Sequence, residues 1–372
     1  MAGAKVATDV DADAFVGNDR RRGRGALTNV SGRYERETRE VFDDGWESLA
    51  ELSAFKTTVH PETVKSIIAR NDSPDLSFDR SINPYRGCEH GCIYCYARPT
   101  HAYLGHSPGL EFETELYAKT NAAERLRAEL AKPSYEAASL ALGAVTDPYQ
   151  PIEKRYEITR QILEVLEETQ HPVGIVTKSH LVTRDLDILS RMAAKGLAKV
   201  AVSVTTLDRR VAREMEPRAA TPHRRLDAIR ALVDAGVPTS VMVAPIVPGL
   251  TDPEIEQILE AACGVGALSG GYVLLRLPLE LKALFREWLV QSFPDRANRV
   301  INLLQSMHGG EDYRSEFGLR QRGSGPFAQL INQRFRKALK RLDMTEIKPS
   351  LRTDLFQKPG RATSGGAQLN LL

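Results

Sequence analysis

The chain has few of the features that mark secreted, membrane-bound or strongly charged proteins. Only four of its 372 residues are cysteine, aromatic residues make up 6%, and the formal net charge is +2. Four cysteines in so long a chain do not make a disulfide framework of the kind found in small secreted domains. A net charge near zero excludes binding of nucleic acid or an acidic membrane by bulk charge, so any basic surface must be local.

Long apolar runs are missing as well. The opening MAGAKVATDVDADAF has no apolar core of a secretory signal, and no later run approaches the ~18 apolar residues of a membrane span. These absences predict a cytoplasmic protein with no membrane partner, and they do not indicate an oligomeric state. An apolar content of 42% is ordinary for globular proteins and suffices for one large or two medium domains.

A repeated strand and helix pattern fills residues 80–295. Short runs that are apolar on both faces, as buried parallel strands are, predict strands over 81–85, 139–145, 173–179, 199–206, 237–246 and 271–279. Helical spacing follows most of them, over 153–169, 183–196, 222–236 and 252–263. The pattern predicts an α/β fold, a partial (β/α)6 barrel of TIM type. A doubly wound sheet is the alternative, although no G-x-G-x-x-G follows the first strand.

The flanking regions differ in composition from this core. Residues 1–35, with RRRGRG at 20–25, predict a disordered basic tail. Residues 36–79 are predicted to form an extension that packs on the barrel, 296–345 a basic helical cap, and 346–372 a flexible tail.

Residues 314–341 in the cap hold eight Arg or Lys and one Glu. Phe317, Phe327 and Phe335 alternate with these cations, which is typical of a surface that stacks on nucleic-acid bases. The spacing of Phe327, Leu330, Ile331, Phe335 and Leu339 equally fits an amphipathic helix that covers the barrel. Both interpretations remain open at this point.

Three of the four cysteines lie within eight positions. Cys88, Cys92 and Cys95 have the spacing C-x3-C-x2-C directly after the first predicted strand, where a barrel places its reactive residues. Iron–sulfur clusters usually take four cysteine ligands, so a trio leaves one iron open to a substrate or cofactor. Cys263 lies in a helical apolar pattern and is predicted to be a small hydrophobe.

A structural zinc site is the alternative for the trio. His90, His101 or His106 would then supply the fourth ligand. Structural zinc usually has a second, well separated pair of ligands, and the sequence shows none.

The stretch GCEHGCIYCY after a strand resembles the radical S-adenosylmethionine (SAM) enzymes. The resemblance implies that Cys88, Cys92 and Cys95 hold a 4Fe-4S cluster whose open iron binds SAM. It also implies that an electron donor such as flavodoxin or ferredoxin reduces the cluster, and that SAM is cleaved to a 5′-deoxyadenosyl radical. Tyr94 would lie against the adenine.

Further stretches, over roughly residues 80 to 250, are similar to the branch related to spore photoproduct lyase. That branch has Tyr directly after the third Cys, here Tyr96. The similarity implies cofactor-binding roles for Lys178 in VTK and Ser203 in VSV. It implies the same for Glu216 and Arg225 in EPRAATPHRRLDAIR, where Glu216 would neutralise a cation, either Arg225 or part of SAM.

The stretch GAVTDPYQP departs from the family in two ways. Many radical SAM enzymes have G-G-E after the second strand to hold the SAM amino group, so Thr146 and Asp147 are predicted to take that role. The lyase has a hydrogen-donating Cys there, where this chain has Ala144 and Val145. Tyr96 is then the first candidate for a catalytic hydrogen donor.

Three functions are compatible with these patterns. The first is a radical SAM enzyme that acts on nucleic acid in a lyase-like repair or modification. The second is a radical SAM enzyme that acts on a protein or small metabolite. The third is a non-catalytic nucleic-acid-binding module with a structural metal.

Overall fold

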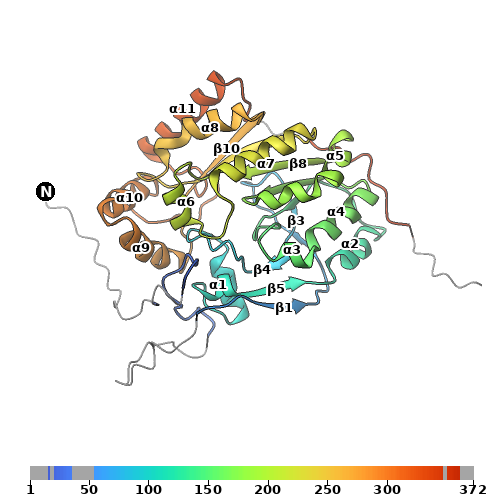
Figure 1. Cartoon of the computed structure of the whole chain (residues 1–372), viewed down its shortest axis with the longest axis horizontal. Helices are drawn as coiled ribbons and strands as arrows, with labels where there is room; N and C mark the ends of the chain where they lie inside the picture. Colours follow the sequence, from blue (N-terminus) through green and yellow to red (C-terminus); the bar gives the residue numbers. More distant parts are fainter. Residues whose placement is uncertain (1–15, 17–20, 36–53, 347–349, 361–372) are drawn as a thin grey trace, which may run out of the picture.

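The computed structural model describes residue 16 and residues 21–35, 54–346 and 350–360, and its main body is built on a seven-stranded sheet (Figure 1). In spatial order its strands are β10 (Ser269–Leu274), β9 (Thr239–Ile246), β8 (Ala198–Ser203), β7 (Val173–Thr177), β6 (Leu140–Leu142), β3 (Arg80–Ile82) and β2 (Ile68–Arg70). Neighbours pair in parallel except β2, which is antiparallel to β3. Within the described residues β2 and β10 form two separate edges, so the barrel is open.

The order of the strands decides between the two predicted architectures. From β3 to β10 the spatial order follows the chain without the reversal that defines a doubly wound sheet. Six parallel strands therefore form the predicted partial (β/α)6 barrel, and this prediction is confirmed. The first predicted strand, 81–85, is divided in the structure into β3 and β4 (Tyr85–Arg86), on either side of Pro84.

Helices connect successive strands and cover the outer face of the sheet (Figure 1). They are α4 (Ile158–Glu168), α5 (Leu186–Ala194), α7 (Pro222–Asp234) and α8 (Ile255–Gly264). The predicted helix over 153–169 is split at Glu157, whose φ of 50° separates α3 (Glu153–Tyr156) from α4. No helix in the described part of the chain is long and apolar enough to cross a membrane.

A second, three-stranded sheet joins the N-terminal extension to the cysteine-rich region. Its order is β1 (Thr58–Glu62), β5 (Glu115–Lys119), β4, with β1 parallel and β4 antiparallel to β5. The short elements nearby and along the core are η3 (Arg98–Leu104), α1 (Glu111–Thr114), α2 (Ala122–Leu130), η4 (His180–Asp185), α6 (Arg209–Met215) and η5 (Asp252–Glu254). Because β4 leads directly into the first cysteine, this sheet fixes the start of the cysteine-rich loop.

Part of the predicted disordered tail is buried. Residues 1–15 and 17–20 lie outside the described residues, but Arg24, Ala26, Leu27 and Thr28 are at most 8% exposed. The backbone N–H groups of Gly25 and Ala26 each donate to the Glu113 carboxylate at 2.9 Å. The prediction of disorder is wrong for this stretch, because its hydrogen-bond partner lies almost ninety positions further along the chain.

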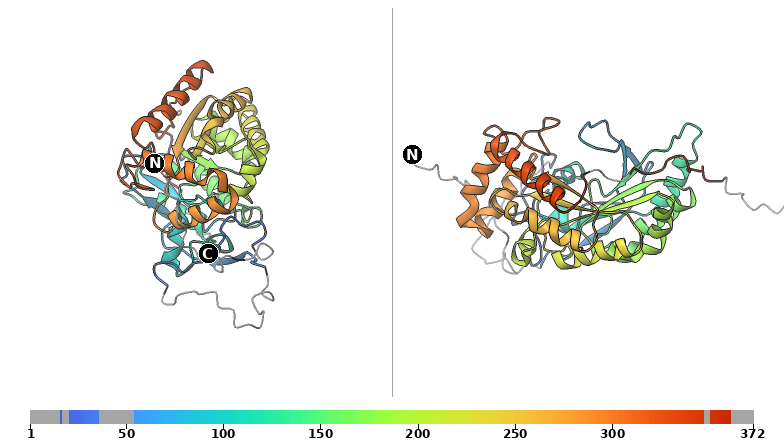
Figure 2. Two further views of the ribbon diagram at one scale, coloured as in Figure 1. Left: turned by 90° about the vertical axis from the view of Figure 1, so that its left-hand side faces the viewer. Right: turned by 90° about the horizontal axis from the view of Figure 1, so that it is seen from above.

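Three helices follow the barrel: α9 (Leu281–Ser292), α10 (Pro294–Met307) and α11 (Gly325–Arg341). Figure 2 shows α11, in red, at the edge of the sheet that β10 forms. The Phe335 ring lies 4.7 Å from that of Tyr272 on β10, so the apolar face of α11 packs on the sheet as the amphipathic interpretation predicted. On the polar face Arg334 pairs with Glu256 at 2.6 Å and Arg341 pairs with Glu260.

The end of the chain is also more ordered than expected. The backbone N–H groups of Arg352 and Gln357 donate to Gly196 and Thr169, at 3.0 and 2.9 Å. The Phe356 ring lies 5.3 Å from the buried His171. Residues 350–360 therefore lie along the ends of α4 and α5, and the prediction of a flexible tail is wrong there. Residues 347–349 and 361–372 lie outside the described residues.

A polar seam connects the two edges of the open barrel. The loop between β2 and β3 presents Ser73 and Asp75 to the loop between α10 and α11. Arg320 Nε donates to Asp75 at 2.6 Å, and the Gly318 N–H donates to the same carboxylate at 2.7 Å. Arg320 also donates to Ser73. The loop between β2 and β3, at one edge of the sheet, therefore touches the loop between α10 and α11 through hydrogen bonds and one ion pair, and not through strand pairing.

Candidate functional site

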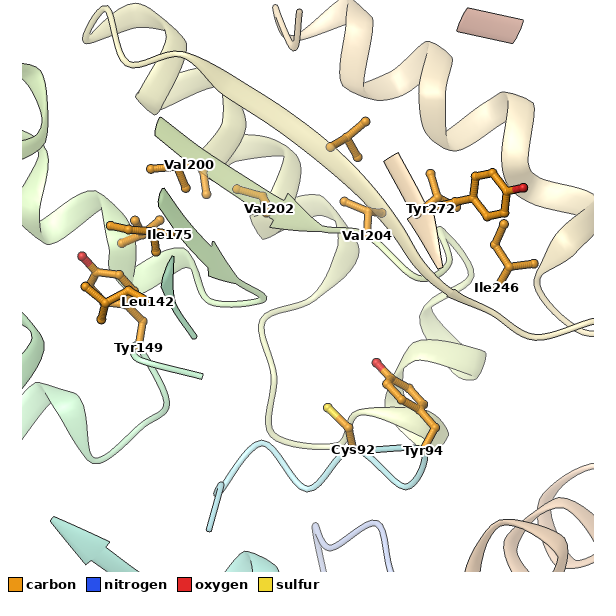
Figure 3. Packing of buried hydrophobic residues seen from close by; sticks show 14 of the residues in the cluster. Cys92, Tyr94, Leu142, Tyr149, Ile175, Val200, Val202, Val204, Ile246 and Tyr272 are labelled. Atoms are coloured by element: carbon orange, nitrogen blue, oxygen red, sulfur yellow. The ribbon is translucent and has the colours of Figure 1, made fainter. Parts of the chain in front are cut away.

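The cysteine loop, residues 87–95, lies between β4 and η3. The Cys88 N–H donates to the Phe112 carbonyl at 3.0 Å, and the Ile93 N–H donates to the Met215 carbonyl at 3.1 Å. Met215 ends α6, which follows β8, so the loop is held against the carboxyl ends of the strands. Figure 3 shows Cys92 and Tyr94 pointing from the loop toward the strands.

A fully buried arginine fixes the shape of this loop. Arg98 uses its five N–H donors on Glu113 and on the carbonyls of Gly91, Cys92, Pro108 and Gly109, at 2.5 to 3.1 Å. Its ion pair with Glu113 has no exposed surface on either side chain. Buried charges are tolerated when they are paired and fully hydrogen-bonded, so this pair can hold the loop in one conformation.

The three thiols of the loop share one buried environment. Cys88 and Cys92 are 7% and 8% exposed, and Cys95 is half-buried. Burial raises the pKa of Cys88 well above its usual value, and Asp147 and the other two thiols raise it further. Burial and Glu216 raise the pKa of Cys92 to about 12. Thiolates crowded in this way are stable only beside a strong positive charge, which iron ions supply.

No fourth thiol joins the three in the described structure. Cys263 lies on α8, and its Sγ contacts the Leu342 carbonyl at 3.7 Å. The nearby histidines are engaged elsewhere: His90 with Asp147 at 3.4 Å, His101 with the Glu115 carbonyl at 2.9 Å, and His106 with the Tyr117 hydroxyl at 2.6 Å.

The arrangement also disfavours a structural zinc. Among the described residues, no group of three or more His, Cys, Asp or Glu side chains could hold a single metal ion. A cubane cluster needs no such convergence, since each thiolate binds a different iron. The three cysteines therefore fit a cluster with one open iron better than they fit zinc.

Asp147 links the cysteine loop to the ends of β6 and β7. Its carboxylate accepts from Thr177 Oγ1 and from the Lys178 N–H, both at 2.7 Å. Burial alone would raise the pKa of Asp147, but the neighbouring His90 and these hydrogen bonds outweigh burial and lower it to about 2. Thr146 donates to the Tyr85 carbonyl at 3.0 Å. Both residues predicted to hold the SAM amino group therefore lie after β6, and their hydrogen bonds connect this stretch to β4 and to the end of β7.

Tyr94, Glu216 and Arg225 form a buried network beside Cys92. The Tyr94 hydroxyl donates to Glu216, and Arg225 pairs with the other carboxylate oxygen. Burial alone would raise the pKa of Glu216, but Arg225 and Lys178 outweigh burial and lower it. Of the two cations considered for Glu216, the structure pairs it with Arg225.

Lys178 and Ser203 lie where the sequence predicted them, at two neighbouring strand ends. Lys178 follows β7, and its Nζ lies 5.6 Å from the centre of the Tyr94 ring. Ser203 ends β8, is 3% exposed, and its carbonyl accepts from Arg225 at 3.1 Å. The Lys178 ammonium group therefore lies beside the loop that carries the thiols, and Ser203 is connected to the same buried network through Arg225.

Tyr96 lies on the outer side of the loop and is 41% exposed. Its hydroxyl donates to the Ala144 carbonyl, and the Arg276 guanidinium lies 4.2 Å from the centre of its ring. Val145 packs against a small group of buried side chains formed by Cys88, Ala97 and Phe112. The two positions at which the lyase-like cysteine is absent are thus in contact with the cysteine loop and with Tyr96.

Four residues of this site were not found by sequence reasoning. Arg98 and Glu113 clamp the loop, Gln150 donates to the Gly87 carbonyl at 3.1 Å, and Arg276 covers Tyr96. The sequence marks two of them only by their position. Arg98 closely follows the cysteines, and Gln150 lies in the stretch GAVTDPYQP after the second predicted strand.

Sequence comparison gives a family and several relatives. The family model of the radical SAM superfamily matches residues 82–262. An uncharacterized protein of Mycobacterium tuberculosis is 39% identical over 251 residues, 66% of this chain and 73% of the relative. A radical SAM Nalpha-GlyT isomerase of Pseudomonas phage M6 is 30% identical over 186 residues, 49% of this chain and 36% of the relative.

Solved structures of spore photoproduct lyase share the fold. One mutant of that enzyme superposes with a TM-score of 0.57 at 17% identity, over 83% of this chain and 86% of the lyase. A second mutant, with bound AdoMet and dinucleoside spore photoproduct, also gives 0.57, at 16% identity with the same coverage. The cysteine loop at the strand ends and the family model agree, and the phage relative is named a radical SAM enzyme: the chain belongs to the radical SAM superfamily of enzymes, whose members bind a 4Fe-4S cluster and SAM.

Proposed function

We propose that this enzyme cleaves SAM at a 4Fe-4S cluster held by Cys88, Cys92 and Cys95, and that its substrate is a nucleic acid. The observation that carries the first half is the buried trio of thiols with no fourth ligand among the described residues. Cluster and SAM together supply reductive cleavage of the sulfonium and a radical that removes hydrogen from a substrate. Membership of an enzyme superfamily sets aside the hypothesis of a non-catalytic module with a structural metal.

The chain's own residues are suited to hold SAM on one side of the loop. The ammonium group of Lys178 lies at a strand end beside Tyr94, within reach of a carboxylate bound at the loop. Asp147 and Thr146 follow β6, on one side of β7, and Ser203 ends β8, on the other side of β7. The Glu216–Arg225 pair fixes Tyr94 through its hydroxyl, so the ring can pack against a flat base.

Replacement of Lys178 by alanine is expected to weaken SAM binding about tenfold or more, since a hydrogen bond to a charged group contributes about 1.5–3 kcal/mol. Equilibrium dialysis with the reconstituted protein measures this, and iron content should not change. Lys195→Ala, an exposed lysine at the end of α5, is the matched control. Equal SAM affinity in the Lys178 and Lys195 variants would refute the assignment.

Support for a nucleic-acid substrate comes from relatives and from one surface. The fold resembles a lyase solved with a dinucleoside photoproduct, and the phage relative is named a Nalpha-GlyT isomerase. Two exposed rings have a guanidinium group beside them, Tyr96 with Arg276 at 4.2 Å and Phe317 with Arg320 at 4.7 Å. Exposed rings beside guanidinium groups stack on bases without sequence preference.

The basic face of α11 supports this substrate less well than its composition predicted. Arg334, Arg336 and Arg341 are paired with glutamates, and Phe335 is fully buried. Paired cations release fewer counterions when they meet a phosphate backbone. The exposed rings of Tyr96 and Phe317, and not paired cations, are therefore the stronger part of the proposed interface.

Replacement of Phe317 by alanine should weaken binding of single-stranded oligonucleotides by about 1–3 kcal/mol, the contribution of stacking on one base. Phe317 is 58% exposed, so the fold should tolerate the change. Leu268→Ala, which removes a non-aromatic apolar side chain that is 65% exposed, is the control. Fluorescence anisotropy at several salt concentrations gives the affinities.

Turnover separates binding from chemistry in the same experiment. Oligonucleotides should raise the rate of 5′-deoxyadenosine formation. The Tyr96→Phe variant should bind oligonucleotides normally, but it should form no product from them if the Tyr96 hydroxyl is the hydrogen donor. If no DNA or RNA raises that rate while a protein or metabolite pool does, the nucleic-acid half of the proposal is wrong and the cluster half stands.

A further inference from the structure

An arginine-lined cavity of about 360 Å³ lies behind the cysteine loop. It is formed by the buried N-terminal stretch, by α6 and by α9, with Trp288 and Gln291 from the last of these. Its charged lining residues are Arg21, Arg24, Arg210, Arg213 and Glu214. The lining therefore contains four guanidinium groups and one carboxylate.

Two of these arginines lie on α6 and are accessible from solvent. Arg210 and Arg213 on α6 are exposed, and within the described ranges of the chain neither has an ion-pair partner. On α11, in contrast, Arg334 and Arg341 are held by glutamates of α8. At the back of the cavity, burial and then the charge of Arg218 lower the pKa of Arg24. The cavity is thus a site where a negative charge from outside is stabilised.

The cavity shares a wall with the cysteine loop. Gly25 lines the cavity, and a Cβ placed on it would lie 1.9 Å from the Gly91 carbonyl oxygen, so the two backbones are in direct contact. The next residue along the loop is Cys92, and its carbonyl accepts from Arg98 at 2.9 Å. The wall of the cavity is therefore in contact with the residue that precedes Cys92.

We propose that this cavity and the exposed Arg210 and Arg213 beside it are the docking surface for an acidic one-electron carrier protein that reduces the cluster. The proposal rests on the proposed function, because it assumes a cluster at the three cysteines. In each encounter the carrier is oxidised by one electron and the cluster is reduced by one. Electron transfer falls steeply with distance, so a docking surface must lie against the cluster loop, as this one does.

The charge pattern favours a protein carrier over nucleic acid at this place. The positive groups surround a compact hollow and do not form a stripe along which a phosphate backbone could lie. Carrier proteins of this kind are small and acidic, and charge complementarity raises their association rates by about 10–10³-fold at low salt. The arginine–aromatic pairs at Tyr96 and Phe317 remain available to the substrate at the same time.

The test uses the reconstituted full chain and a flavodoxin in its fully reduced form. Arg210→Glu combined with Arg213→Glu is expected to slow flavodoxin-driven reduction of the cluster at least tenfold at low salt, and this loss should shrink as salt rises. The affinity for oxidised flavodoxin, measured by calorimetry, should fall in parallel. Lys337→Glu with Lys340→Glu on α11 applies the same charge change at exposed positions elsewhere and should have little effect.

Reduction by dithionite separates the two possible failures. If dithionite supports SAM cleavage in all variants and flavodoxin reduction is equal in the α6 and α11 variants, the docking proposal is overturned and the proposed function stands. If the α6 variant loses oligonucleotide binding but keeps its flavodoxin rate, the surface belongs to nucleic acid. If dithionite yields no SAM cleavage in the unaltered protein, the proposed function itself fails.

Discussion

Replacement of Cys88, Cys92 or Cys95 by alanine is expected to remove the cluster entirely. Anaerobically prepared protein should contain about four irons per chain and a brown visible absorption band, because thiolates alone hold the cluster. Each single variant leaves only two thiols in the loop. Iron analysis and the visible spectrum should therefore fall to background, and SAM cleavage should vanish with them.

Cys263→Ala is the matched control for these variants. Its thiol donates to the Leu342 carbonyl at 3.7 Å and packs against the core on α8, away from the cysteine loop, so iron content should be unchanged. Loss of the cluster in this variant would show that four thiolates bind it. There would then be no open iron for SAM, and the proposed function would have to be abandoned.

Arg98→Ala should be strongly destabilising. Removing one partner of a fully buried ion pair costs about 3–5 kcal/mol, because the other charge remains buried without its counterion. Here the loss also leaves the carbonyls of Gly91 and Cys92 without their donor. We expect a large decrease in the free energy of unfolding, measured with denaturant, together with reduced cluster incorporation.

Arg127→Ala is the corresponding surface control. Arg127 pairs with Glu168 at 2.6 Å, nearly the same distance, but both side chains are about half exposed. Exposed pairs contribute about 0–1 kcal/mol. If the Arg98 and Arg127 variants lost equal stability, the clamp on the cysteine loop would have no special role. Arg98→Lys tests geometry, since a lysine keeps the charge but cannot span the same carbonyls.

The barrel was predictable because its signals are local and repeated. Each strand is a short apolar run, and helix ends such as Gly196 and Gly236 have the left-handed φ values of 72° and 76° that glycine favours. The spacing of the three cysteines is equally local. These features need no knowledge of distant partners, so periodicity and spacing were enough.

The parts that were missed depend on distant partners. Nothing near Gly25 in the sequence shows that Glu113 will accept its N–H, or that its backbone will meet Gly91. The sequence could not decide whether α11 was a nucleic-acid surface or a covering helix, because Glu256 and Glu260, which pair with Arg334 and Arg341, lie about eighty positions earlier. Composition reports how many charges a segment has, but not which of them are already paired.

The polar seam between Asp75 and Arg320 affects how the proposed nucleic-acid substrate would reach the thiols. A continuous strand has no free end to thread through a closed ring, so on this proposal it would have to enter from the side. The two loops that meet at the seam are joined by one ion pair and a few hydrogen bonds, which water can replace when they part. A seam of interlocked apolar side chains would instead expose hydrophobic area on every opening. On the proposed function, this seam would admit the middle of a long strand and release it without cutting it.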